Sequence, residues 1–109
     1  ASLYGVSKFF REALGRYYSD VHWLSILNLR LGAVIDTDRP KVSRQYPVYL
    51  SHSDCVQLID LCLSAPDSVK YDIFEAVSNN KLRWRDNSHT KDVLGWNPSD
   101  DSYKYIDKQ

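Results

Sequence analysis

A long apolar segment directly behind an amphipathic helix is the feature that most restricts what this chain can fold into. Residues Val21 to Ile35 are rich in leucine and β-branched residues, and Asn28 and Arg30 interrupt the apolar run. A continuous apolar run of this kind is typical of a strand that is covered on both faces, as strands of parallel sheets are. We therefore predict a buried parallel strand and an α/β fold.

The segments on either side of this strand complete the first half of the chain. From Tyr4 to about Ser19, apolar residues recur with the spacing of one helix face, which predicts an amphipathic helix. Residues Asp36 to Pro47 hold two prolines and show no sustained period. This polar segment predicts a loop that is long enough to be of functional interest.

Helix and turn signals continue in the second half. Ser51 is followed three residues later by Asp54, a capping pattern that predicts a helix over residues 52–64. Tyr71 to Val77 has the aromatic and β-branched content of a second strand. Ser88 is expected to cap a third helix that closes at Gly95, and the last ten residues are expected to fray.

Length and charge exclude several classes of protein. The 109 residues suit one domain, and 14 Lys+Arg balance 14 Asp+Glu. An interspersed, neutral charge pattern gives no electrostatic signal for nucleic acid or for an anionic membrane. The chain also lacks the ~20 consecutive apolar residues of a membrane span and the features of a signal peptide. We expect a cytoplasmic protein with neither nucleic acid nor membrane as partner.

Cysteines, histidines and tryptophans are expected to be structural. Cys55 and Cys62 lie seven residues apart on a predicted helix, a separation of about 10.5 Å along the axis that exceeds the reach of a disulfide. They are expected to pack as small apolar side chains. No Cys/His cluster has ligand spacing, so no metal site is predicted. Trp23 and Trp96 are expected in the core.

Basic and aromatic residues cluster at one place, formed by Lys81, Arg83, Trp84 and Arg85. Such a cluster could bind an anionic ligand or single-stranded nucleic acid. Because the net charge is zero, we favour a loop that closes over the fold.

Tyr4 and Lys8 are the residues that most directly suggest chemistry. They lie four positions apart on the first predicted helix, so their side chains meet on one face. A neighbouring ammonium stabilises a phenolate, which makes a tyrosine able to exchange a proton with a hydroxyl or carbonyl oxygen. The same spacing occurs on ordinary solvated helices, so the pair alone is a weak signal.

The segments around this pair strengthen its interpretation as a catalytic site. Three segments follow one another in a characteristic order: LYGVSK (residues 3–8), LNLRLG (27–32) and SHSD (51–54). This order resembles the extended short-chain dehydrogenase/reductase family, also called the NAD-dependent epimerase/dehydratase family. The later segments SNN (78–80), RWRDN (83–87) and LGWNP (94–98) are most similar to its uronate dehydrogenase branch.

The resemblance implies a cofactor and a set of roles. Tyr4 would be the general acid/base, Lys8 would assist it and hold the nicotinamide ribose, and Leu31 would touch the nicotinamide end of NAD or NADP. In the family, the glycine-rich phosphate-binding turn and a catalytic serine precede the tyrosine, and the chain contains no such turn. We expect residues 1–109 to be a single partial domain, the C-terminal half of a Rossmann-like fold without its N-terminal nucleotide-binding half.

Two substrate positions also follow from the resemblance. At the position of Ala33, uronate dehydrogenases carry a serine and nucleotide-sugar epimerases an asparagine that contact substrate. Arg44 lies seven residues before Ser51, where uronate dehydrogenases carry an arginine. A guanidinium group suits the carboxylate of a uronate because it can donate two parallel hydrogen bonds.

The sequence thus predicts part of an NAD(P)-dependent oxidoreductase acting on a sugar or sugar acid, such as a uronate. One alternative is a nucleotide-sugar epimerase or dehydratase. Another is a non-catalytic, truncated relative that self-associates, because the family commonly dimerises through this helix and an apolar face is available at Val6, Phe9, Phe10 and Ala13. A homo-oligomer is expected, and the chain alone is expected to be inactive.

Overall fold

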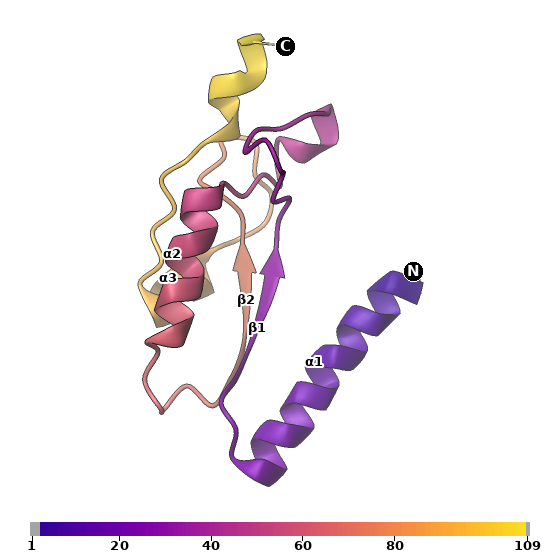
Figure 1. The fold of residues 1–109 in the computed structure, drawn as a ribbon, viewed down its shortest axis with the longest axis vertical. Coiled ribbons are helices and arrows are strands. Elements are labelled where there is room, and N and C mark those ends of the chain that lie inside the picture. The colour runs from indigo at the N-terminus through magenta and orange to yellow at the C-terminus, as the bar shows by residue number, and fades with distance from the viewer. Residues whose placement is uncertain (1–2, 109) are drawn as a thin grey trace.

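The computed structural model describes residues 3–108 as a small sheet with helices on both faces (Figure 1). Helix α1 lies on one side of the sheet, and helices α2 and α3 lie on the other. The elements in chain order are α1 (Leu3–His22), β1 (Ile26–Leu31), the 3₁₀ turn η1 (Ser43–Gln45), α2 (His52–Leu63), β2 (Tyr71–Ala76), α3 (Ser88–Leu94) and the 3₁₀ helix η2 (Ser102–Lys108).

The two strands form a parallel pair, as predicted. Their register runs from Ile26 opposite Tyr71 to Leu31 opposite Ala76. Parallel strands need a long crossover, and here α2 provides it. The α/β prediction is therefore confirmed for the described residues.

The predicted strand from Val21 to Ile35 is wrong at both ends. Helix α1 continues to His22, and Trp23 then turns the chain with a left-handed backbone (φ 60°). The strand is also half-buried instead of covered on both faces. Within the described residues, β1 pairs only with β2. Its apolar side chains therefore have fewer neighbours than those of the fully covered strand that the apolar run predicted.

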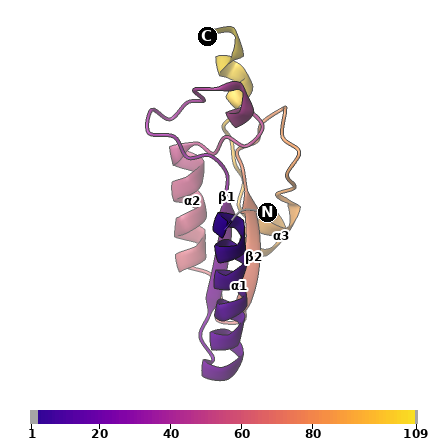
Figure 2. The same cartoon turned by 90° about the vertical axis from the view of Figure 1, so that its right-hand side faces the viewer.

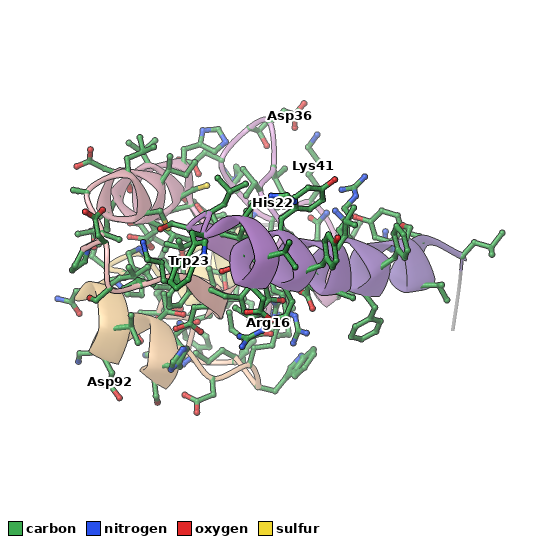
Figure 3. All side chains as sticks on the ribbon, turned by 90° about the horizontal axis from the view of Figure 1, so that it is seen from below. Arg16, His22, Trp23, Asp36, Lys41 and Asp92 are labelled. Atoms are coloured by element: carbon green, nitrogen blue, oxygen red, sulfur yellow. The ribbon has the colours of Figure 1, made fainter. Side chains whose placement is uncertain are left out.

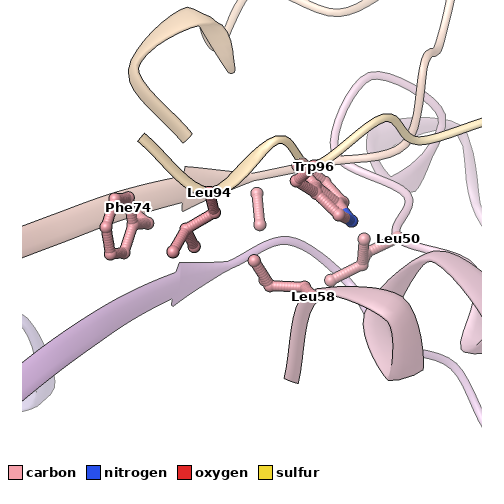
Figure 4. Close-up of a cluster of buried hydrophobic side chains, with 6 residues drawn as sticks. Leu50, Leu58, Phe74, Leu94 and Trp96 are labelled. Atoms are coloured by element: carbon pink, nitrogen blue, oxygen red, sulfur yellow. The ribbon is translucent and has the colours of Figure 1, made fainter. Parts of the chain in front are cut away.

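The apolar core lies between the sheet and the helices α2 and α3 (Figure 4). Its buried members are Leu50, Leu58, Phe74, Ala76, Leu94 and Trp96. Cys55 and Cys62 pack against this cluster as free thiols, as expected, and burial raises the pKa of both. Trp96 is in the core as predicted, whereas Trp23 is 79% exposed, because the turn after α1 carries it away from the sheet.

Residues with capping roles mark the ends of two helices. Ser51 Oγ accepts from the Asp54 amide at 3.1 Å, which confirms the predicted N-cap of α2. Helix α3 ends at Gly95, whose left-handed backbone (φ 73°) suits glycine. Ser88 is its first helical residue and not its cap, since Asn87 occupies the N-cap position.

The C-terminal segment does not fray as far as residue 108. Residues Ser102–Lys108 form η2, and Ser102 is buried. Its hydroxyl donates to the Tyr46 carbonyl at 2.6 Å and its amide donates to Asn80 Oδ1 at 3.0 Å. These two bonds attach the start of η2 to loops that are distant in sequence.

Helix α1 packs on the sheet through one narrow face (Figure 2). Ser19 Oγ donates to the Lys70 carbonyl at 2.9 Å, and Tyr71 Oη donates to the Glu12 carbonyl at 2.7 Å. Gly15 allows a close approach, because an added Cβ would lie 2.9 Å from Ile26 Cγ2. The N-terminal turns of α1 project beyond the body formed by the other elements (Figure 3). None of the described helices is both long and apolar enough to cross a membrane.

Candidate active site

Tyr4 and Lys8 lie side by side on the first turns of α1. The Lys8 ammonium nitrogen is 5.1 Å from the centre of the Tyr4 ring. Tyr4 is 70% exposed, so its hydroxyl is open to a ligand. The structure thus produces the juxtaposition that their spacing predicts.

A groove of about 560 Å³ runs between this part of α1 and the carboxyl end of β1. Tyr4, Lys8 and Leu31 all line it, so the structure brings three of the predicted site residues together. In α/β folds, ligands bind at the carboxyl ends of parallel strands. The groove is therefore placed where such a ligand is expected.

Gly32 shapes the end of this groove. A Cβ at Gly32 would lie 2.0 Å from the Val48 carbonyl oxygen, so no side chain fits there. Directly after it, the Ala33 amide donates to the same carbonyl at 2.7 Å, and the Ala33 carbonyl accepts from Leu50 at 2.9 Å. Ala33 is half-buried and does not line the groove.

Arg44 lies in η1, away from the residues that line the groove. Its side chain is exposed and makes no hydrogen bond or ion pair with another described residue. The turn itself is held by Gln45, whose Oε1 accepts from the amides of Lys41 (2.7 Å) and Val42 (3.3 Å). The guanidinium group is thus available to a ligand, although the described contacts do not bring it to Tyr4.

An ion pair that sequence reasoning missed forms part of the wall of the groove. Arg30 donates from Nε and Nη2 to the two carboxylate oxygens of Glu12, at 2.9 and 2.8 Å. The hydrogen bond from Arg30 holds the pKa of Glu12 below its usual value, against the opposing effect of burial. A charge in the middle of an apolar strand needs a partner, so the position of Arg30 was a signal for this pair.

The groove offers hydrogen-bond donors but no phosphate-binding turn. The Lys8 ammonium contacts the Tyr4 ring and keeps its N–H donors for a ligand hydroxyl, since it has no hydrogen bond to a described residue. No glycine-rich turn leads into a helix N-terminus, the usual site for a pyrophosphate. Among residues 3–108, no group of three or more His, Cys, Asp or Glu could hold a metal ion.

The basic cluster at residues 81–85 mostly binds its own chain, in agreement with the favoured interpretation. Arg83 donates to Asn79 Oδ1 at 2.9 Å, and Arg85 donates to Glu75 Oε1 at 2.8 Å. Trp84 remains exposed. Two of the three cations of this cluster therefore close the loop over the fold.

Comparison with known proteins links the chain to NAD-dependent dehydrogenases. No protein-family model matches it. It is 36% identical over 106 residues (96% of this chain, 40% of the relative) to the NAD-dependent glucose-6-phosphate dehydrogenase of Haloferax volcanii. It is 37% identical over 100 residues (92% of this chain, 36% of the relative) to the uronate dehydrogenase of Agrobacterium fabrum.

A solved structure shows the same relationship. A mutant of uronate dehydrogenase from Agrobacterium tumefaciens, complexed with NAD, matches with a TM-score of 0.88 and 33% identity, over 98% of this chain and 39% of that one. The chain thus spans about two fifths of the length of the relatives it matches. The predicted resemblance to these dehydrogenases, and to part of their Rossmann-like α/β fold, is confirmed.

Proposed function

We propose that the protein containing this chain is an NAD-dependent dehydrogenase that oxidises a sugar or sugar acid. The observation that carries the proposal is the Tyr4–Lys8 pair, which faces a groove at the carboxyl end of β1. The homologous dehydrogenases, one of them complexed with NAD, support the same activity.

Three residues of the groove, Tyr4, Lys8 and Leu31, have proposed roles in this reaction. A bound NAD would supply the hydride acceptor for the carbon that carries the substrate hydroxyl. Tyr4, as phenolate, accepts the proton of that hydroxyl, so that a carbonyl forms. Lys8 stabilises the phenolate and donates hydrogen bonds to the ribose hydroxyls, while Leu31 offers an apolar surface to the nicotinamide ring.

The substrate is proposed to carry an anionic group. Arg44 has an exposed guanidinium group without a described partner, and such a group binds a carboxylate or a phosphate through two parallel hydrogen bonds. The names of the relatives include a uronate and a sugar phosphate, which both carry such a group. Ala33 follows the last groove residue, Gly32, and is proposed to contact the sugar through its methyl group only, because its amide and carbonyl are bonded to Val48 and Leu50.

Two further parts of the assembly are proposed. The NAD phosphates are expected to bind to a nucleotide-binding half outside residues 1–109, because these residues contain no glycine-rich turn. A second copy is expected on the apolar face of α1, where Val6, Phe10 and Leu14 are exposed. Sedimentation of the natural protein and of its Phe10→Gln variant tests this contact, since a monomeric natural protein would contradict it.

The activity is tested by following NADH formation with a hexuronate, an aldose and an aldose 6-phosphate. Tyr4→Phe removes the proton acceptor and keeps the ring, so kcat should fall roughly 10²- to 10⁴-fold. Tyr17→Phe is the matched control, because Tyr17 is exposed on the same helix and does not line the groove.

The outcomes separate the alternatives. Normal turnover by Tyr4→Phe would exclude this role for Tyr4. Conversion of a nucleotide sugar without net NADH formation would favour an epimerase or dehydratase. The absence of turnover with all substrates would favour the non-catalytic relative.

A further inference from the structure

Three charged side chains from the two strands and the loop before α3, Arg30, Glu75 and Arg85, form a closed ring at the wall of the groove. Glu12 of α1 joins this ring through Arg30. Arg30 joins Glu12 through two hydrogen bonds and donates from Nη1 to Glu75 Oε2 at 3.2 Å. Glu75 also accepts from Arg85 Nε at 2.8 Å, and Arg85 Nη2 donates to the Arg30 carbonyl at 2.5 Å. The ring therefore holds both the side chain and the backbone of Arg30.

Glu12 is the first side chain along α1 that is hydrogen-bonded to the sheet among the described residues. The later attachments, at Ser19 and at the close approach of Gly15, hold only the second half of the helix. Figure 1 shows α1 diverging from β1 towards its N-terminus. At Glu12 itself, Tyr71 Oη holds the backbone carbonyl and Arg30 holds the side chain. Because Tyr71 fixes only one backbone point, the tilt of the first half of α1 about that point depends on the bond between Glu12 and Arg30.

Tyr4 and Lys8 lie on the same helix face as Glu12, eight and four residues before it. At 1.5 Å per residue they are about 12 and 6 Å further along the axis, so a small change of tilt at Glu12 moves them away from β1. We infer that the Glu12–Arg30 pair is a positioning device, which sets the distance of Tyr4 and Lys8 from Leu31 and Gly32 across the groove.

This role needs an arginine on β1. The guanidinium group binds both oxygens of Glu12 in one plane and still has a third N–H direction for Glu75, which a lysine ammonium cannot reproduce. Glu12 is largely buried, with 15% of its side chain exposed, so the geometry of the pair is well defined. The hydrogen bonds that Arg30 donates to Glu12 and Glu75 raise the pKa of Arg30, so the cation is permanent.

The kinetic test rests on the proposed dehydrogenase activity. Because reacting groups must be held closely aligned, Glu12→Gln should lower kcat on the order of 10²-fold while the sugar KM stays within twofold. In a Lys8→Ala background, Glu12→Gln should lower kcat little further, since one of the groups that the Glu12–Arg30 pair positions is already absent. Asp20→Asn is the matched control, because it breaks an exposed ion pair with Arg16 on the same helix.

A second measurement does not depend on activity. Hydrogen–deuterium exchange of the natural protein should become faster at the amides of residues 3–11 in Glu12→Gln and in Arg30→Lys. The amides of residues 16–22, and the whole of α1 in Asp20→Asn, should keep the exchange rates of the natural protein.

The results distinguish the inference from the function on which it rests. If turnover does not depend on Tyr4, the proposed function fails, and the exchange measurement alone decides the positioning role. If turnover depends on Tyr4 but the effects of Glu12→Gln and Lys8→Ala on kcat are fully additive, the positioning role is wrong. Unchanged exchange at residues 3–11 in both variants would overturn it as well.

Discussion

At the scale of single residues, the proposed role of Arg44 in binding the anionic group of the substrate can be tested by substitution. Arg44→Lys keeps the charge and loses the two-pronged geometry, so the KM for a uronate should rise about 10-fold, the value of one charge-assisted hydrogen bond. Steady-state kinetics should show an unchanged KM for NAD.

Arg39→Lys is the matched control for this prediction, because Arg39 lies in the same loop and stacks on Tyr105 at 4.8 Å. An equal rise of the uronate KM in both variants would assign the effect to the charge of the loop. An unchanged KM in Arg44→Lys would remove Arg44 from the substrate site.

Among the glycines at positions 15, 32 and 95, Gly32 has the least space around it. Gly32→Ala would place a Cβ 2.0 Å from the Val48 carbonyl oxygen and 2.9 Å from Val77 Cγ1. We expect the free energy of unfolding to fall by about 3 kcal/mol or more, since backbone cannot yield as a side chain can. Urea denaturation measures this loss.

Gly15→Ala provides the comparison for Gly32. Its new Cβ would meet the side-chain atom Ile26 Cγ2 at 2.9 Å, and alanine favours a helix by about 1 kcal/mol over glycine. The two effects oppose each other, so the change should stay within about 1 kcal/mol. An equal loss at both glycines would contradict the assigned role of the Val48 carbonyl.

At the scale of elements, Asp54 connects α2 to the chain that follows α3. Its buried carboxylate accepts from Ser78 Oγ at 2.6 Å and from the amides of Ser99 (2.9 Å) and Asp100 (3.1 Å). Asp54→Asn replaces one accepting oxygen by a donor that faces other donors. The free energy of unfolding should therefore fall by about 3 kcal/mol, as measured by urea denaturation.

Asp60→Asn tests whether the buried position of Asp54, and not the loss of a negative charge on α2, causes this destabilisation. Asp60 is exposed on the same helix, and its side chain makes no hydrogen bond with a described residue. Its substitution should change stability by less than about 0.5 kcal/mol. A similar loss in both variants would show that the net charge of α2 is responsible.

At the scale of the whole molecule, stability should decrease in acid. Hydrogen bonds from Arg30 lower the pKa of Glu12, and those from Ser51 and Ser53 lower the pKa of Asp100. The unfolded chain then binds protons at higher pH than the folded chain does. The contribution of these two carboxyl groups to stability should be constant above about pH 5 and should fall as the pH passes down through the lowered values.

Urea denaturation midpoints at a series of pH values check this prediction. Glu12→Gln removes one of the responsible carboxyl groups, so its midpoint should depend less steeply on pH than that of the natural protein. An equal slope in both would show that Glu12 does not contribute to the acid sensitivity.

Local sequence determined most of the helices and strands and the Tyr4–Lys8 pair of the candidate site. Helical periodicity located α1, and the capping serine at position 51 located α2, because these signals depend on residues within one or two turns. The spacing of Tyr4 and Lys8 alone placed the two side chains together, since helix geometry brings such residues to one face.

Tertiary structure decided what lies between elements. Arg30 finds Glu12 across 18 positions, and Asp54 binds the Ser99 amide across 45. Sequence periodicity carries no information about such partners, because they depend on which faces meet after folding. For the same reason, the sequence pattern predicted Trp23 in the core, whereas the turn after α1 exposes it. The pattern also predicted that Ser102 belongs to a fraying end, whereas the fold buries it.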